Sequence, residues 1–212
     1  MGDRVEPFGL KETPELLADL AAVVRQDQLA MKRFYQAMAP SVYQFSMRRL
    51  SDPVEAQEVV VETLYEVWCH AHRFTGQSSI RTWVLGIARH KLLDKLRERY
   101  RHQHESFDEN TETHTNGLTE PESDAPEGFE RVAQRQQHDM IVHCTQKLPA
   151  DQREALHLAF YEDLPLAEIA QVQACPENTV KTRLFHARRK MKECLQRVFK
   201  HDAFAFVGDR HD

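Results

Sequence analysis

The sequence predicts an all-α protein in which two small helical domains are joined by an acidic flexible linker, the second domain being a helix-turn-helix. Three observations support this prediction. Apolar residues recur at helical spacing over most of the chain, and the alternating pattern of strands is nearly absent. Residues 101–130 interrupt this periodicity and hold nine acidic residues against one Arg. The segments before and after this interruption each contain one strongly basic helical stretch.

The helical segments follow from periodicity and from helix start and stop signals. Helices are expected at 15–50 with one interruption, 54–72, 79–99, 131–147, 151–161, 166–172 and 177–200. The composition of 101–130, acidic with Pro and Gly, is typical of a disordered or extended linker. We therefore expect an N-terminal tail at 1–14, a first domain at 15–100, the linker at 101–130, a second domain at 131–200 and a C-terminal tail at 201–212.

Local charge differs from the chain's net charge of −5. Residues 81–101 carry seven Lys/Arg and two acidic residues, a net +5, and residues 177–200 carry eight and two, a net +6. Each basic run taken alone is explained by a solvated helix face. Two such helices in separate domains favour two contact points on a polyanion.

Several classes of protein are disfavoured. No run of about 18 apolar residues is present, so no membrane insertion is expected. The N-terminus has acidic residues and prolines where a signal peptide needs an apolar region, which favours a cytoplasmic protein. The sequence has no glycine-rich phosphate loop, nucleophile elbow or metal-ligand pair, so we expect no enzyme, cofactor or metal site. Reduced thiols are expected because four cysteines lack a paired spacing: Cys69, Cys144, Cys175 and Cys194.

The segment from Leu166 to Met191 has the spacing of a helix-turn-helix. A short helix is followed by a turn that ends at Pro176, where the missing N–H suits the start of the next helix. Five side chains are expected to face inward on the two helices beside Ala170: Leu166, Ile169, Val180, Leu184 and Met191. The leading face of the second helix would offer base-contacting side chains to a major groove, with arginines better placed for phosphates.

The helix expected at 54–72 carries two apolar stripes. One consists of Val60, Leu64, Val67 and Ala71, and the other of Val61, Tyr65 and Trp68. Both stripes could be buried in a helical packing, or one could remain exposed to meet a partner. The residues alone leave these two interpretations open.

The loop before the helix at 79–99 combines aromatic and polar residues. Gly76 allows a tight backbone path, and Ser78 or Ser79 can cap the helix. Phe74 and Trp83 provide flat apolar surfaces near several cations, an arrangement suited to an unstacked single-stranded base. For Trp83 alone, packing in the core is the favoured interpretation.

Two quoted stretches resemble a known family. "LPADQREALHLAFYEDLPLAEIAQVQACPENTVKTRLFHARRKM" is similar to the C-terminal DNA-binding domain, region 4, of sigma-70-type RNA polymerase sigma factors. "SDPVEAQEVVVETLYEVWCHAHRFTGQSSIRTWVLGIARHKLLDKLRERYR" resembles region 2 of the same family, with Arg81, Thr82 and Trp83 as its clearest match. The two-domain layout resembles the extracytoplasmic-function (ECF) group. Departures include the apolar Val61 in place of Gln, His90 in place of Asn and Ala174 in place of Gly.

The resemblance implies a promoter-specificity subunit that binds core RNA polymerase, recognises −35 and −10 elements, helps to melt the −10 region and directs initiation at a specific regulon. It implies contacts with the clamp of the largest subunit and the flap of the second subunit. The polymerase-binding residues would be Glu58, Val61, Glu62 and Tyr65. The −10 contacts would be Phe74, Gly76, Gln77, Ser78, Arg81, Trp83, Arg89, His90 and Arg97. The −35 contacts would be Asn178, Thr179, Lys181, Thr182, Arg183, Phe185, Arg188 and Arg189.

Other roles remain open at this point. Family members are commonly held by an anti-sigma factor, and Phe199, Phe204, Phe206 and Val207 could bind one or fold back on the second domain. The linker could mimic nucleic acid in the polymerase or act as a tether. The alternative function is a helix-turn-helix regulator that acts without polymerase, which would need a dimer interface to read a palindrome.

Overall fold

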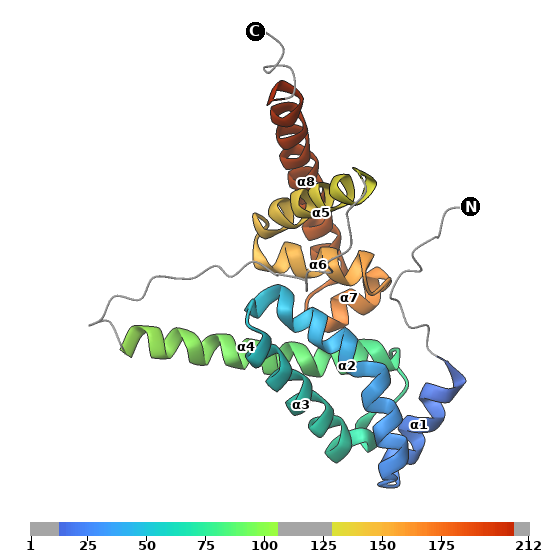
Figure 1. The fold of residues 1–212 in the computed structure, drawn as a ribbon. Helices are drawn as coiled ribbons and strands as arrows, with labels where there is room; N and C mark the ends of the chain where they lie inside the picture. Colours follow the sequence, from blue (N-terminus) through green and yellow to red (C-terminus); the bar gives the residue numbers. More distant parts are fainter. Residues whose placement is uncertain (1–12, 106–128, 206–212) are drawn as a thin grey trace. The chain divides into compact units, whose positions relative to one another are not determined.

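The computed structural model describes residues 13–105 and 129–205, and every regular element in these two ranges is helical. The helices are α1 (Pro14–Val24), α2 (Gln28–Leu50), α3 (Pro53–His70), the 3₁₀ turn η1 (Ala71–Arg73), α4 (Ile80–Glu105), α5 (Phe129–Gln146), α6 (Ala150–Phe160), α7 (Leu166–Val172) and α8 (Glu177–Ala205). Figure 1 shows them along the chain. The all-α prediction is confirmed.

Local side chains explain where the first helices start. The Asp27 carboxylate accepts the N–H groups of Leu29 and Ala30, and the Asp52 carboxylate accepts those of Val54 and Glu55. These carboxylates satisfy donors that have no partner inside the helix. The break expected within 15–50 lies between α1 and α2, where Gln26 adopts a positive φ of 63°.

The contacts divide the chain into two units. Unit 1 comprises Met1–Leu118 together with His157–Glu177. In its described part, α2, α3 and α4 pack against one another, and α7 packs against α4. The largest fully buried side chains of this core are apolar and come from six helices: Val23, Phe34, Met38, Val42, Val59, Val60, Leu64, Ile80, Leu85, Leu92, Leu158 and Ile169.

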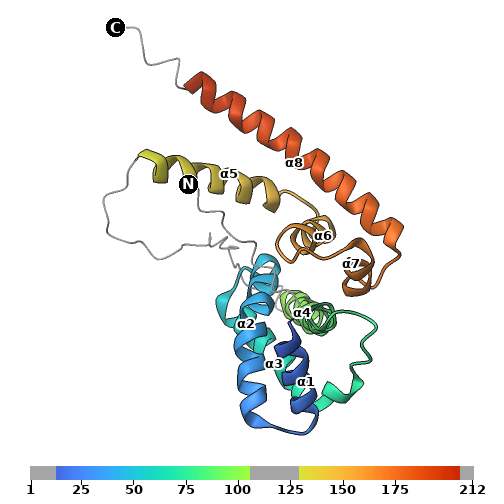
Figure 2. The ribbon, with the colours of Figure 1, turned by 90° about the vertical axis from the view of Figure 1, so that its right-hand side faces the viewer.

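Unit 2 comprises Thr119–Leu156 together with Asn178–Asp212. Within it α5 and α8 lie side by side, as Figure 2 shows. A disulfide joins Cys144 of α5 to Cys194 of α8, with 5.7 Å between the two Cα atoms. Small and apolar side chains are buried around these helices: Leu148, Ala155, Val180, Leu184 and Ala187.

The expectation of four reduced thiols is therefore wrong for Cys144 and Cys194. These two residues are 50 positions apart, so their pairing depends on how α5 meets α8 and leaves no local pattern in the sequence. Cys69 and Cys175 are free, the first exposed and the second half-buried.

Two expected segments differ in extent from the helices. Helix α4 continues to Glu105 and α5 starts at Phe129, so both enter the span expected as linker. Residues 106–128 lie outside the described residues, and so do the proposals about the linker's role. Helix α8 continues to Ala205, but the side chains of Phe199, Phe204, Phe206 and Val207 lie outside the described part. Among the described helices, none is long and apolar enough to cross a membrane.

Removal of the disulfide is expected to destabilise unit 2. Cys144→Ser opens a covalent loop of 50 residues, which by chain entropy lowers the free energy of unfolding by about 4 kcal/mol. Hydrogen exchange of the α5 and α8 amides in the oxidised full chain measures this loss. Cys69→Ser, at an exposed free thiol, is the matched control and should leave exchange unchanged. Equal exchange in the two variants would contradict the prediction.

Candidate nucleic-acid and protein interfaces

Helix α3 buries one of its two apolar stripes and exposes most of the other. Val60, Leu64 and Val67 are at most 1% exposed, whereas Val61 is 53% exposed and Tyr65 67%. Trp68 is half-buried beside them. A shallow groove continues this exposed surface and is lined by Pro53, Val54, Gln57, Glu58, Val61 and Glu62. The structure resolves the question left open by the sequence, because the second stripe is available to a partner.

Acidic side chains border this surface on the side of α4. Lys95 Nζ lies 2.6 Å from Glu58 Oε2 and 3.4 Å from Glu62 Oε1. The hydrogen bond that Lys95 donates to Glu58 outweighs partial burial and raises the pKa of Lys95 above its usual value. Glu58 and Glu62 keep about half of their side-chain surface exposed, so both expected polymerase-binding carboxylates are oriented by α4 and remain accessible.

The loop between η1 and α4 brings the two expected aromatic residues together. The ring centroids of Phe74 and Trp83 are 5.4 Å apart, and both side chains are half-buried. Gly76 adopts a φ of +73° and is exposed, as is Gln77. The Thr82 N–H donates to Ser79 Oγ over 3.2 Å, so Ser79 rather than Ser78 caps α4.

The basic residues of α4 are unequally exposed. His90 and Arg97 are exposed, Arg89 is half-buried, and Arg97 pairs with Asp94 at 2.7 Å. Lys91 lies 3.4 Å from Glu66 of α3. Arg97 therefore provides an exposed cation on α4 for a nucleic-acid backbone.

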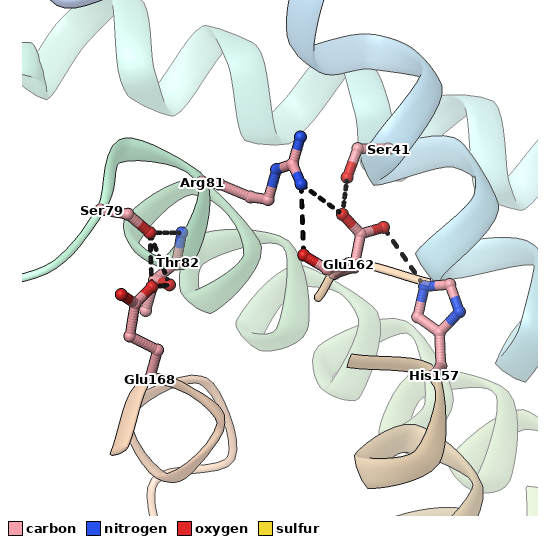
Figure 3. A network of polar contacts seen from close by, with 7 residues as sticks. All are labelled: Ser41, Ser79, Arg81, Thr82, His157, Glu162 and Glu168. Carbon is pink, nitrogen blue, oxygen red and sulfur yellow. Dashed lines mark hydrogen bonds and ion pairs between the residues drawn. The ribbon is translucent and has the colours of Figure 1, made fainter. Parts of the chain in front are cut away.

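Arg81 is different, because its residue is only 6% exposed (Figure 3). Its Nη1 donates to the carbonyl oxygen of Glu162 over 3.3 Å and lies 3.6 Å from Glu162 Oε2. The same carboxylate accepts from Ser41 Oγ over 2.8 Å and lies 3.4 Å from His157 Nε2. Burial lowers the pKa of Arg81, against the opposing effect of Glu162. Burial alone would raise the pKa of Glu162, but His157, Ser41 and Arg81 together hold it below its usual value.

A second carboxylate meets the start of α4. Ser79 Oγ donates to Glu168 Oε2 over 2.5 Å, and the Thr82 hydroxyl donates to the same oxygen. Both contacts are drawn in Figure 3. The sequence analysis missed Glu162 in the loop after α6 and Glu168 in α7, since an isolated acidic residue is most simply interpreted as solvated. Their placement depends on long-range packing that no local pattern signals.

The start of α8 presents most of the expected −35 contacts. Asn178, Lys181, Thr182, Phe185, Arg188 and Arg189 are exposed, and Thr179 is half-buried. Arg183 instead pairs with Asp151 of α6 at 2.7 Å. Phe185 is 63% exposed, so its ring is accessible beside the polar side chains of this helix face. In the turn before this helix, Ala174 adopts a positive φ of 48°, the conformation for which Gly is usual.

Metal coordination finds no support in the described residues. No group of three or more His, Cys, Asp and Glu side chains within them could hold a metal ion. His70 lies 3.6 Å from Glu66, and its ring packs edge-on against that of His72. Contacts within the protein therefore explain the positions of these two histidines.

Comparisons with known proteins match two separate segments of the chain. Residues 34–102 match the family model of Sigma-70 region 2, and residues 138–191 match that of Sigma-70, region 4. RNA polymerase sigma-H factor from Pseudomonas aeruginosa is 32% identical over 157 residues, covering 73% of this chain and 80% of that protein. ECF RNA polymerase sigma factor SigK from Mycobacterium tuberculosis is 28% identical over 188 residues, covering 86% and 96%.

Solved structures share the fold at lower identity. The sigma factor RpoE in complex with the anti-sigma factor NepR, from Bartonella quintana, superposes with a TM-score of 0.61 at 22% identity, covering 78% of this chain and 96% of that one. CnrH in complex with the cytosolic domain of CnrY gives 0.60 at 18% identity, covering 86% and 97%.

Replacing each of two glycines near the candidate nucleic-acid surface by Ala should have opposite effects on the free energy of unfolding. Gly76→Ala should lower the free energy of unfolding by roughly 1 kcal/mol, since a Cβ is strained at its positive φ. Gly86→Ala, within α4 and with no heavy atom within 4 Å of the added Cβ, should raise it by about 0.5–1 kcal/mol. Urea unfolding of the two variants measures both values, and a neutral or stabilising Gly76→Ala would be inconsistent with this loop geometry.

Proposed function

Because this chain belongs to the ECF group of the sigma-70 family of RNA polymerase sigma factors, non-enzymatic subunits that direct transcription initiation, we propose that it contacts the −35 and −10 promoter elements with its two basic helices. The observation that carries the proposal is the start of α8. There, exposed polar and aromatic side chains occupy the leading turns and exposed arginines follow them. This order matches base contacts at the leading end of a groove-bound helix and phosphate contacts after it.

At the −10 element, the loop at 74–79 and the exposed side of α4 would hold the melted strand. Phe74 and Trp83 lie close enough to act together, and the neighbouring Gln77 is exposed for polar contacts. Stacking contributes about 1–3 kcal/mol per base, and the exposed Arg97 further along α4 would neutralise part of the backbone. These features support single-strand binding, with Trp83 sharing its surface between the core and the loop.

The exposed face of α3 would bind core polymerase, on the clamp of the largest subunit. Val61 and Tyr65 provide apolar surface at its centre, and Glu58 and Glu62 provide carboxylates at its border. An apolar centre with a polar rim is the composition of a specific protein interface. The second domain would contact the flap of the second subunit, as in other members of the family.

Regulation by an anti-sigma factor is also proposed, because two structures with this fold are described as complexes with such a protein or with the cytosolic domain of CnrY. The protein would act in the cytoplasm, where core polymerase and promoter DNA are found. The set of genes that it directs would depend on the promoter sequence that α8 contacts.

A charge placed on the exposed face of α3 should disrupt polymerase binding. Val61→Asp desolvates a carboxylate at the centre of the proposed interface, so affinity for purified core polymerase should fall at least about tenfold, equivalent to about 1.4 kcal/mol. Leu17→Asp makes the same kind of change at a 46% exposed position of α1 and is the matched control. Fluorescence anisotropy of the labelled chain gives both affinities, and similar losses for the two variants would rule out the α3 interface.

Lys181 and Arg189 should differ in the kind of contact they make. Lys181→Ala should cost roughly 1–3 kcal/mol at the cognate promoter and relax preference at one base position. Arg189→Ala should weaken binding to all sequences about equally and reduce the salt slope by about one unit. Run-off transcription on a series of −35 mutants, with both variants in complex with core polymerase, measures the ranking. An unchanged ranking with Lys181→Ala would show that this helix face does not read bases.

A further inference from the structure

Residues His157–Glu177 form a closing segment that packs on the first domain. They contain the end of α6, the following loop and α7. Although they follow the first domain by many residues, they belong to unit 1, and α7 packs against α4. Glu162 and Ile169 of this segment are 5% and 0% exposed.

The first anchor of the closing segment is the Glu162 carboxylate, which is bound from two helices of the first domain. Ser41 of α2 donates to it over 2.8 Å, and Arg81 of α4 lies 3.6 Å away through Nη1. Figure 3 shows these groups converging on one side chain. Aromatic contacts lie beside this anchor: Arg48 lies 3.9 Å above the centre of the Tyr161 ring, and the rings of Phe45 and His157 are 6.0 Å apart.

The second anchor is Glu168 in the first turn of α7. Its Oε2 accepts hydrogen bonds from the hydroxyls of Ser79 and Thr82 at the first turn of α4. Arg81 lies between these two residues in the sequence, so the two carboxylates together engage Ser79, Arg81 and Thr82 at the start of α4. The turn follows directly after the loop proposed to hold the −10 strand.

The Arg81 guanidinium forms only some of the hydrogen bonds that it can donate. Only Nη1 has a partner, whereas Nε and Nη2 are buried and have no hydrogen-bond partner among the described residues. Nε and one Nη form the edge that a guanidinium uses for two parallel hydrogen bonds to a phosphate or carboxylate. Buried donors without partners destabilise the state that buries them. The closed arrangement therefore holds Arg81 in place but leaves a phosphate-binding edge unsatisfied.

We propose that the closing segment is an internal substitute for DNA phosphate, whose Glu162 and Glu168 carboxylates occupy the start of α4 in the free protein and must leave before a single strand binds there. The ligand of the opened site is a phosphate of single-stranded DNA, held by the Arg81 edge together with the Ser79 and Thr82 hydroxyls. This inference rests on the proposed −10 role of the loop. Binding that stabilises the open state would release the site by a shift in population.

The closed state is tested without DNA or polymerase by the reactivity of arginine towards phenylglyoxal, read by peptide mass spectrometry on the full chain. Arg97, on the same helix with a side chain that is 72% exposed, is the internal reference. In the free wild-type protein, Arg81 should react at least about tenfold more slowly than Arg97, because only the open fraction is reactive. Equal reactivity would overturn the proposal.

The role of the carboxylates is tested by Glu168→Ala and Glu162→Gln, each of which removes one negative charge. Asp163→Asn removes the same charge from an exposed position of the closing segment, where Asn tolerates the positive φ of 52°. Both Glu variants should raise the reactivity of Arg81 several-fold, whereas Asp163→Asn, which also removes a negative charge that acts on Arg81, should have a much smaller effect. Glu168→Ala alters a half-buried side chain, so it remains informative if Glu162→Gln fails to fold. Protection of Arg81 that survives in every folded Glu variant would overturn the proposal.

The exclusion of nucleic acid is tested with fluorescent single-stranded oligo(dT) and the free chain. If about a tenth of wild-type molecules are open, Glu168→Ala should bind about tenfold more tightly than Asp163→Asn. If the two variants bind oligo(dT) with equal affinity although Arg81 is more reactive in Glu168→Ala, the carboxylates do not occupy the place of a DNA phosphate and the proposal is wrong. These measurements do not involve polymerase. Their failure would overturn the closing-segment proposal alone, whereas the proposed function fails only if the chain does not support transcription by core polymerase.

Discussion

The burial of α4 is the constraint on which unit 1 depends. Ile80, Val84, Leu85, Ala88 and Leu92 are fully buried on one side of this helix, while its other sides carry the basic residues. Burial of about five such side chains fixes the rotation of the helix, since each contributes on the order of 1–3 kcal/mol. That rotation sets the direction in which the polar side chains of the first turn point, and it orients Lys95 towards α3. It also leaves the second apolar stripe of α3 exposed.

Much of this arrangement could be predicted from the sequence, because helices depend on local periodicity and on caps such as Asp27 and Asp52. The helix-turn-helix spacing and the aromatic residues Phe74 and Trp83 near the loop were also visible there, although their contact was not. Three features were not: which α3 stripe is exposed, the bond between Cys144 and Cys194, and the carboxylates that bury Arg81. Each depends on contacts between residues far apart in the sequence. The local sequence around a Glu or a Cys does not indicate which distant residue it contacts.

The two function classes weighed from the sequence predict different surfaces. A regulator that acts alone needs a self-complementary interface to read a palindrome, whereas a polymerase subunit needs a surface for a larger partner. The exposed face of α3 joins apolar Val61 and Tyr65 to acidic Glu58 and Glu62. This face is distinct from the basic side of α4. The arrangement suits a protein that binds polymerase through α3 and DNA through α4 within one small domain.

The central claim is that promoter recognition by this chain requires core polymerase. The most direct measurement is transcription from a pool of genomic fragments with purified core polymerase, this chain, or both, followed by sequencing of the transcript 5′ ends. The account predicts discrete start sites that share upstream −35 and −10 elements and that arise only when both components are present. Absence of such transcripts, with tight and specific binding of the same fragments by the chain alone, would contradict it.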